Sequence, residues 1–404
     1  MVRRSCYDDT TMKILILTPL YWPSIGGVQV SMALLAAYLV KNNHSVKVLT
    51  SQMKDLDEGA IRNFRRIVNF PASEQRDGVS IRRFPTGGPL DSLFALMFAA
   101  AYRLKLFFWP RLYRLYRQRR FRASSILRHA KGYAPDIIVA GPFMDELTRL
   151  GLEARRRTGA KLVIKTSLHI SSAGLELKDL STLKECDAII TNTPAEKDFL
   201  VRSGVPESIL HVTGASVDIE SLEAASSNTA NEELKVLFQK KYVLFLGRKQ
   251  EGKGLTTLVE AFLEPFEALK NTTLVLAGLN TDYFDERIRP RISGNPFIQV
   301  IETLDEPSKW PLLKHAAVYC MVSNIDSFGI SYLEAWLSGV PVVAADVPAM
   351  RYVIKDQKTD FWCPTRIRTA SAKPSADCCQ TRLSPGVWAK KDVKRLFWKE
   401  ETTR

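Results

Sequence analysis

The strongest constraint on the fold is an alternation of strand and helix patterns that begins twice along the chain. In the first part, short apolar runs are separated by segments of helix length. A short uninterrupted apolar run is typical of a strand buried on both faces, so this alternation predicts a parallel sheet covered by helices. The runs are KILILT (13–18), SVKVLTS (45–51), PDIIVAG (135–141), KLVIKTS (161–167) and DAIITNT (187–193).

The alternation lapses at LEAASSNTANEEL (222–234), whose small polar residues favour a linker, and then restarts. With 404 residues the chain can form two cores. We therefore expect an α/β protein of two doubly wound, Rossmann-like domains, 12–221 and 235–360, facing a cleft, with ligands outside the carboxyl ends of the strands. The later runs are YVLFLG (242–247), TTLVLAG (272–278), AVYCMVS (317–323) and VPVVAAD (340–346).

The first expected strand leads into TPLYWPSIGGVQ, where Gly26 and Gly27 precede a helix. Glycines allow close approach of the backbone to a ligand, and a helix N-terminus offers unpaired N–H groups to an anion. A flexible turn is the alternative. The motifs GxGxxG and GxxxxGK[ST] are absent, which disfavours a nucleotide-dependent oxidoreductase and a P-loop NTPase.

The first strand of the second domain leads into LGRKQEGKGL, which carries two cations at the strand end. Arg248 offers a fork of donors and Lys253, between two glycines, offers a point charge. This pair suits a diphosphate. A solvated basic loop is the alternative.

Two carboxylates follow in SNIDSFGISYLEAWLSGVPVVAAD (323–346), where Asp326 and Glu334 stand eight residues apart. On one helix this spacing puts both acids near one face. Carboxylates accept hydrogen bonds from hydroxyls, so two of them near two cations describe a site for a nucleotide sugar. Ordinary surface acids are the alternative, but the apolar neighbours of Glu334 argue against it.

Taken in this order, the three stretches resemble the GT-B glycosyltransferases of the retaining family 4, over about residues 12–360. The match includes the pattern EA…G.PVV, formed here by Glu334, Ala335, Gly339 and Pro341 to Val343. The resemblance implies that Arg248 and Lys253 bind the donor diphosphate and that Glu334 binds the ribose.

The resemblance also implies that Asp326 contacts the transferred sugar, although the family usually has Glu there. It implies further donors from the backbone of Phe328 and Gly329, and no metal ion or other cofactor. His169 lies where the family often has a histidine in the cleft; a structural histidine is the alternative. Retention would follow a front-face route in which the donor phosphate receives the acceptor proton.

The formal charge of +14, from 57 Lys and Arg against 43 Asp and Glu, indicates an anionic partner. Residues 103–122 hold eight Lys or Arg and no acid. On a helix from Pro110, arginines 111, 114 and 117 share one side, which favours peripheral contact with an anionic membrane. A helix packed on the sheet is one alternative. Nucleic acid is another, but no binding motif accompanies the charge.

The N-terminus has no apolar stretch of signal-peptide type, and the longest apolar run, 93–102, is about half of what spans a bilayer. The six cysteines have no zinc-ribbon spacing and do not suggest a disulfide framework. We therefore expect a cytoplasmic protein, peripheral on the inner face of the membrane. A peripheral position on the membrane would suit an acceptor that is carried on a lipid, for example a polyprenyl-linked glycan.

From residue 361 the chain becomes an atypical basic tail with ten Lys and Arg against four Asp and Glu. The strand, the helices and the crossing helix of the family are not recognisable there, so we expect either a divergent end or one altered by a frameshift or truncation. The resemblance to the glycosyltransferases implies a hexosyltransferase for cell-surface polysaccharide or glycolipid synthesis. The alternative is an impaired GT-B protein that binds nucleotide sugar or membrane without turnover.

Overall fold

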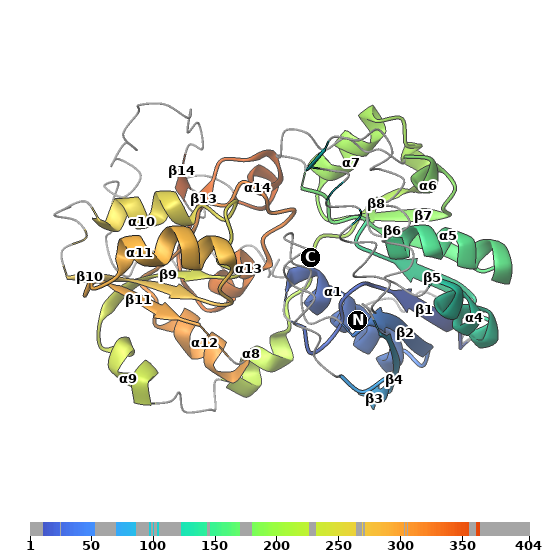
Figure 1. The fold of residues 1–404 in the computed structure, drawn as a ribbon, viewed down its shortest axis with the longest axis horizontal. Coiled ribbons are helices and arrows are strands. Elements are labelled where there is room, and N and C mark those ends of the chain that lie inside the picture. Colours follow the sequence, from blue (N-terminus) through green and yellow to red (C-terminus); the bar gives the residue numbers. More distant parts are fainter. Residues whose placement is uncertain are drawn as a thin grey trace, which may run out of the picture. The chain divides into compact units, whose positions relative to one another are not determined.

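The computed structural model describes residues 11–24, 26–52, 70–85, 97, 100, 103–104, 123–143, 146–169, 180–225, 232–263, 269, 271–302, 304, 306–354 and 361–363. These residues form two compact units, each built on its own sheet with flanking helices (Figure 1). The first unit comprises residues up to 168, 176–192 and 197–213, and the second comprises 169–175, 193–196 and the chain from 214.

The first unit has an eight-stranded sheet in the order β3-β4-β2-β1-β5-β6-β7-β8. All neighbours are parallel except β3 and β4, which form an antiparallel hairpin. Its strands are β1 (Lys13–Leu17), β2 (Ser45–Ser51), β3 (Ser73–Arg76), β4 (Val79–Phe84), β5 (Ile137–Ala140), β6 (Lys161–Lys165), β7 (Ala188–Thr191) and β8 (Leu210–Val212).

The second unit has a six-stranded sheet in the order β11-β10-β9-β12-β13-β14, parallel throughout. Its three central strands, β9, β10 and β12, are buried along nearly their whole length, as the apolar runs predict. Its strands are β9 (Lys241–Leu246), β10 (Thr272–Ala277), β11 (Ile298–Ile301), β12 (Val318–Met321), β13 (Val342–Ala345) and β14 (Phe361–Cys363).

Helices connect the strands and flank the sheets (Figure 1). Those of the first unit include α1 (Gly27–Lys41), α4 (Ala123–Tyr133), α5 (Glu146–Thr158), α6 (Leu180–Lys184) and α7 (Pro194–Arg202). The later helices include α8 (Ile219–Ala225), α9 (Glu232–Phe238), α10 (Leu255–Leu263), α11 (Arg289–Ile292), α12 (Glu306–Lys314), α13 (Ile330–Leu337) and α14 (Pro348–Val353). Among the described residues, no helix combines the length and the apolar character that crossing a bilayer requires.

Two details differ from the sequence prediction. The expected linker 222–234 is partly helical, because α8 and α9 extend into it from either side. The chain beyond residue 360 also contributes a strand, since β14 pairs in parallel with β13. The sequence pattern did not reveal this strand.

Candidate functional site

The turn after β9 packs directly on the segment that follows β12. Gly254 has a φ of +74°, and a Cβ there would clash with the carbonyl oxygen of Val322. A Cβ on Gly252 would lie 2.5 Å from Cγ2 of Ile325, and the carbonyl of Gly252 accepts a hydrogen bond from the backbone N–H of Asn324 at 3.0 Å. Both glycines that flank Lys253 are therefore required for this close contact.

The close packing brings Lys253 to Asp326. The ammonium of Lys253 donates to Oδ1 of the carboxylate, and the two side chains are 15% and 13% exposed. Burial alone would raise the pKa of Asp326, but the charge and hydrogen bond of Lys253 outweigh it and hold the pKa below its usual value. The Oδ2 atom is buried and has no hydrogen-bond partner within the part of the chain that the structure describes.

Asp326 does not lie on the helix that carries Glu334, so the predicted arrangement of both acids on one helical face is wrong. Helix α13 begins only at Ile330. Gly329, just before it, has a φ of +79°, a left-handed conformation that suits glycine, and a Cβ there would clash with the ring of Tyr332. This glycine ends the preceding loop, which carries Asp326.

Glu334 lies within α13 and is buried, as its apolar neighbours predict. Its Oε1 atom accepts a hydrogen bond from Nζ of Lys309 at 2.9 Å, and the two side chains are 11% and 12% exposed. Lys309 comes from α12 and its ammonium also lies 4.6 Å from the ring centroid of Trp310. Lys309 was not among the predicted site residues, because no sequence motif links it to Glu334.

Two buried tyrosines fix α13 beneath the strand ends. The hydroxyl of Tyr319 is hydrogen-bonded to the carbonyl of Leu246 at 3.1 Å and to the hydroxyl of Ser331 at 2.7 Å. The hydroxyl of Tyr332 donates to the carbonyl of Met321. Burial raises the pKa of both phenols well above the usual value. They therefore stay neutral and hold the start of α13 to β9 and β12.

The remaining predicted residues of the second unit lie close by in the chain. Arg248 is half-buried two residues after β9. The side chain of Phe328 is buried in the core, where its ring faces Gly214, at which a Cβ would lie 3.7 Å away. Phe328 and Gly329 thus form the loop that leads into α13. Their donor role, and that of Arg248, stays a prediction.

Gly26 and Gly27 lie in the first unit, where α1 begins at Gly27. The φ of Gly26 is 168°, an extended conformation that any residue adopts. The loop before them is held by Arg83, which donates to the carbonyl of Trp22 at 2.9 Å, and by Arg76, which lies 3.6 Å from the Trp22 ring centroid. The contact of these glycines with a donor stays a prediction.

His169 follows β6 and is exposed. It belongs with the second unit, and its electrostatic interaction with Asp326 is among the smaller influences that lower the pKa of that carboxyl. A catalytic role for His169 stays a prediction.

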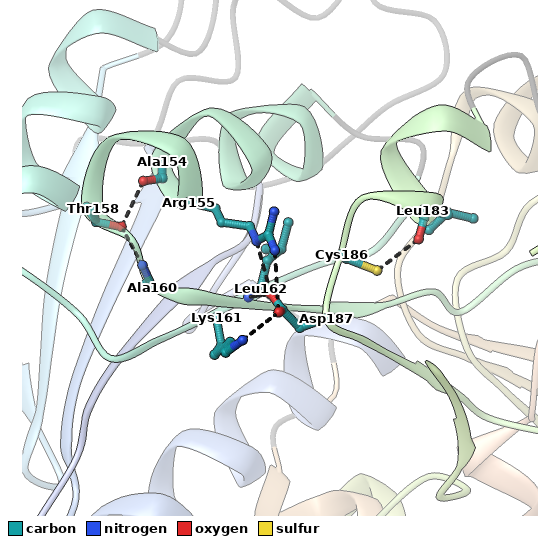
Figure 2. A network of polar contacts seen from close by, with 9 residues as sticks. All are labelled: Ala154, Arg155, Thr158, Ala160, Lys161, Leu162, Leu183, Cys186 and Asp187. Atoms are coloured by element: carbon teal, nitrogen blue, oxygen red, sulfur yellow. Dashed lines mark hydrogen bonds and ion pairs between the residues drawn. The ribbon is translucent and has the colours of Figure 1, made fainter. Parts of the chain in front are cut away.

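A second polar network, around Asp187, lies at the amino ends of β6 and β7 (Figure 2). Asp187 accepts hydrogen bonds from Arg155 at 3.0 Å, from Lys161 at 3.1 Å and from the backbone N–H of Leu162 at 2.9 Å. Burial opposes ionisation, but these donors lower the pKa of Asp187 from 3.8 to about 2. Because ligands of such sheets bind at the carboxyl ends, this network serves stability.

Within the described ranges, no cluster of three or more His, Cys, Asp or Glu side chains could hold a metal ion. The membrane contact predicted for residues 103–122 falls almost entirely outside the described residues.

Two families match this chain, each over one of its two units. "Glycosyltransferase Family 4" matches residues 25–221, and "Glycosyl transferases group 1" matches residues 240–376. Together they cover most of the sequence, including the segments that carry the three predicted motifs.

Several curated proteins are similar in sequence to parts of this chain. A phosphatidyl-myo-inositol mannosyltransferase of Mycobacterium leprae is 34% identical over 128 residues, which cover 31% of this chain and 33% of the relative. A D-inositol 3-phosphate glycosyltransferase of Segniliparus rotundus is 27% identical over 200 residues, covering 45% of this chain and 43% of the relative. The matched region of this chain thus spans about a third of the first relative's length and less than half of the second's.

Solved structures share the fold. The Anabaena protein Alr3699/HepE, in complex with UDP and glucose, matches with a TM-score of 0.60 and 17% identity, over 87% of this chain and 85% of that one. Sucrose-phosphate synthase of Thermosynechococcus elongatus matches with a TM-score of 0.66 and 16% identity, over 91% of this chain and 89% of that one. With its two parallel-sheet units and both family matches, the chain belongs to the GT-B glycosyltransferases of family 4, glycosyl transferases group 1.

Proposed function

We propose that this protein transfers a sugar from a nucleotide-sugar donor to a hydroxyl of a glycan or lipid-linked acceptor, with retention of configuration. The observation that carries the proposal is the buried contact between Lys253 and Asp326 at the carboxyl ends of β9 and β12. A cation for phosphate and a carboxylate for sugar hydroxyls are side by side there, at the sheet edge where ligands of doubly wound domains bind.

Each side chain of the site has a proposed part in holding the donor. Arg248 and Lys253 bind the diphosphate, and Oδ2 of Asp326 accepts a hydrogen bond from a hydroxyl of the transferred sugar. Glu334, whose Oε1 atom accepts a hydrogen bond from Lys309, binds the ribose. In the front-face route, the acceptor hydroxyl gives its proton to the departing donor phosphate as the new glycosidic bond forms.

The acceptor class is proposed from the relatives and from charge. One relative is named for phosphatidyl-myo-inositol and another for D-inositol 3-phosphate, both anionic acceptors. The formal charge of +14 suits an anionic acceptor, and residues 103–122 suit an anionic membrane. We therefore favour glycolipid or cell-surface polysaccharide synthesis at the inner face of the membrane.

A panel of UDP-, GDP- and ADP-sugars, followed by thermal shift, tests the donor. At least one should raise the melting temperature of the wild type and fail to do so for Lys253→Ala. Lys240→Ala, which removes an exposed lysine, is the matched control and should respond as the wild type does. If no nucleotide sugar shifts the wild type, the proposed donor is wrong.

Turnover decides between an active enzyme and a binding protein. Release of free nucleoside diphosphate in the presence of a membrane extract, absent with Lys253→Ala, is expected for the enzyme. Donor binding without any release would favour the impaired GT-B protein.

A further inference from the structure

Lys249 is a fully buried lysine in the turn that carries Arg248 and Lys253. Lysine is almost never fully buried without compensating partners, because an ammonium loses its hydration there. Lys249 was not among the predicted site residues, and the proposed donor contacts do not use it.

The ammonium of Lys249 joins the carboxyl ends of three neighbouring strands. From the end of β9 it donates to the carbonyl of Gly278 after β10, to Oδ1 of Asn280 at 2.9 Å, and to the carbonyl of Ile301 at the end of β11 at 3.0 Å. Three acceptors match the three ammonium donors. The side chain thus ties the turn after β9 to both strands on that side.

The backbone of Lys249 reinforces the same connection. Its N–H donates to the carbonyl of Leu279 at 2.8 Å, and its own carbonyl accepts from the hydroxyl of Thr281 at 2.5 Å. Lys249 also forms a parallel bridge with Asn280. Because Arg248 directly precedes Lys249 in the chain, these contacts also restrain the backbone at Arg248.

The charge of Lys249 is not neutralised by direct contact, because all three of these acceptors are neutral. The charged groups that face it are Glu302 after β11, Asp285 in the π-helical turn Phe284–Ile288, and Arg289 at the start of α11. Arg289 itself pairs with both acids, at 2.9 Å and 2.6 Å. Burial lowers the pKa of Lys249 from 10.5 to about 8, and Glu302 opposes this shift.

We propose that Lys249 is a positioning residue of the donor site: it locks the turn after β9 so that Arg248 is held toward the diphosphate, and it adds a buried positive charge behind that turn. The inference depends on the proposed donor chemistry. It differs from a purely structural role, since a structural lysine would change stability without changing how nucleotide binding depends on pH.

Calorimetric titration with UDP, GDP and ADP at about pH 7 and about pH 8.5 tests the proposal, because these values lie on either side of the pKa of Lys249. The wild type should lose affinity by about threefold or more at the higher pH as the ammonium deprotonates. Lys249→Met keeps the length but removes the charge. It should bind about tenfold more weakly at pH 7 and show no further loss at pH 8.5.

Lys314→Met, at an exposed position, is the matched control and should keep the wild-type pH dependence. If Lys249→Met melts at a lower temperature but keeps wild-type affinity and pH dependence, the residue is only structural and the inference is overturned. If that variant does not fold, a flat wild-type affinity between the two pH values overturns it. If none of the three nucleotides binds the wild type, the proposed donor fails and the inference fails with it.

Discussion

The ammonium of Lys253 donates a hydrogen bond to the carboxylate of Asp326, 73 residues further along the chain. Lys253, the residue proposed to bind phosphate, and Asp326, the residue proposed to bind the sugar, therefore neutralise each other's charge when no donor is bound. A diphosphate that binds Lys253 must compete with Asp326, and in doing so it releases the carboxylate toward the sugar. In the proposed donor site, binding of the diphosphate would therefore make the carboxylate of Asp326 available to sugar hydroxyl groups.

The first prediction follows from this competition. Asp326→Asn removes the competing charge, so free nucleoside diphosphate should bind as tightly as to the wild type or more tightly. The nucleotide sugar should lose the advantage that it has over the free nucleotide, because Asn accepts fewer hydroxyl hydrogen bonds. Calorimetry with both ligands measures the ratio. Asp198→Asn, at an exposed acid of α7, should leave it unchanged; equal weakening of both ligands by Asp326→Asn would contradict the assignment.

The second prediction concerns the pair of Lys309 and Glu334. Both side chains are mostly buried, so Lys309→Met should destabilise the second unit by roughly 3 kcal/mol because it removes the cation of a buried ion pair. The double variant Lys309→Met/Glu334→Gln should recover much of that stability. Urea unfolding followed by fluorescence measures both values.

The same double variant separates stability from binding. It should still bind free nucleotide and nucleotide sugar more weakly than the wild type, because Glu334 is assigned to the ribose that both ligands share. Wild-type nucleotide affinity in the refolded double variant would remove Glu334 from the donor site.

The third prediction compares two glycines of the second unit with nearly equal φ. Gly254 (φ +74°) has the carbonyl of Val322 where a Cβ would lie, whereas Gly294 (φ +76°) has nothing within 4 Å. Gly294→Ala should cost only the left-handed strain, about 1 kcal/mol. Gly254→Ala should cost clearly more and should also weaken nucleotide binding, because Lys253 moves. Urea unfolding and calorimetry measure the two effects, and similar losses in both variants would contradict the close packing.

The fourth prediction concerns pH and Asp187. Its folded pKa of about 2 lies below the ordinary 3.8, so its stabilising effect is complete above about pH 4 and is lost as the pH falls toward 2. Solvent partly screens the pair, so the effect should be roughly 1–2 kcal/mol. Asp187→Asn should lower stability at neutral pH by that amount and flatten the decline below pH 4. An unchanged acid profile in this variant would show that other carboxyls control it.

The fifth prediction concerns residues 103–122. Replacing arginines 111, 114 and 117 with Gln should weaken binding to anionic vesicles by up to ~1 kcal/mol per charge, most strongly at low salt. Co-sedimentation at two salt concentrations measures this. If the wild type does not sediment with such vesicles, the acceptor need not be on a membrane.

The repeated strand pattern was enough to predict both parallel sheets, because a strand buried on two faces leaves a continuous apolar run. The hairpin of β3 and β4 was missed. Its strands are short and carry charged residues. Arg83 is buried there, and its guanidinium forms an ion pair with Glu74 at 2.7 Å. The turn Asp77-Gly78, with φ of +48° and +77°, is the local signal that could have revealed it.

The arrangement of the candidate site residues could not be predicted from the sequence. The motifs pointed to Lys253, Asp326 and Glu334, yet the helix was expected to include Asp326, because the left-handed Gly329 was not recognised as a boundary. Lys309 has no sequence motif that ties it to Glu334. Only the packing of α12 against α13 brings this pair together.

Strand β14 covers the edge of β13, and this affects where a fragment that contains the second sheet can end. A fragment that stops at Asp360 would lack this strand and would leave β13 with an open row of backbone donors and acceptors. Such an open edge is a template for strands of other molecules, so the fragment would tend to associate and precipitate. A fragment that keeps the second sheet intact should therefore end beyond Cys363, within the segment that the sequence predicts to be a tail.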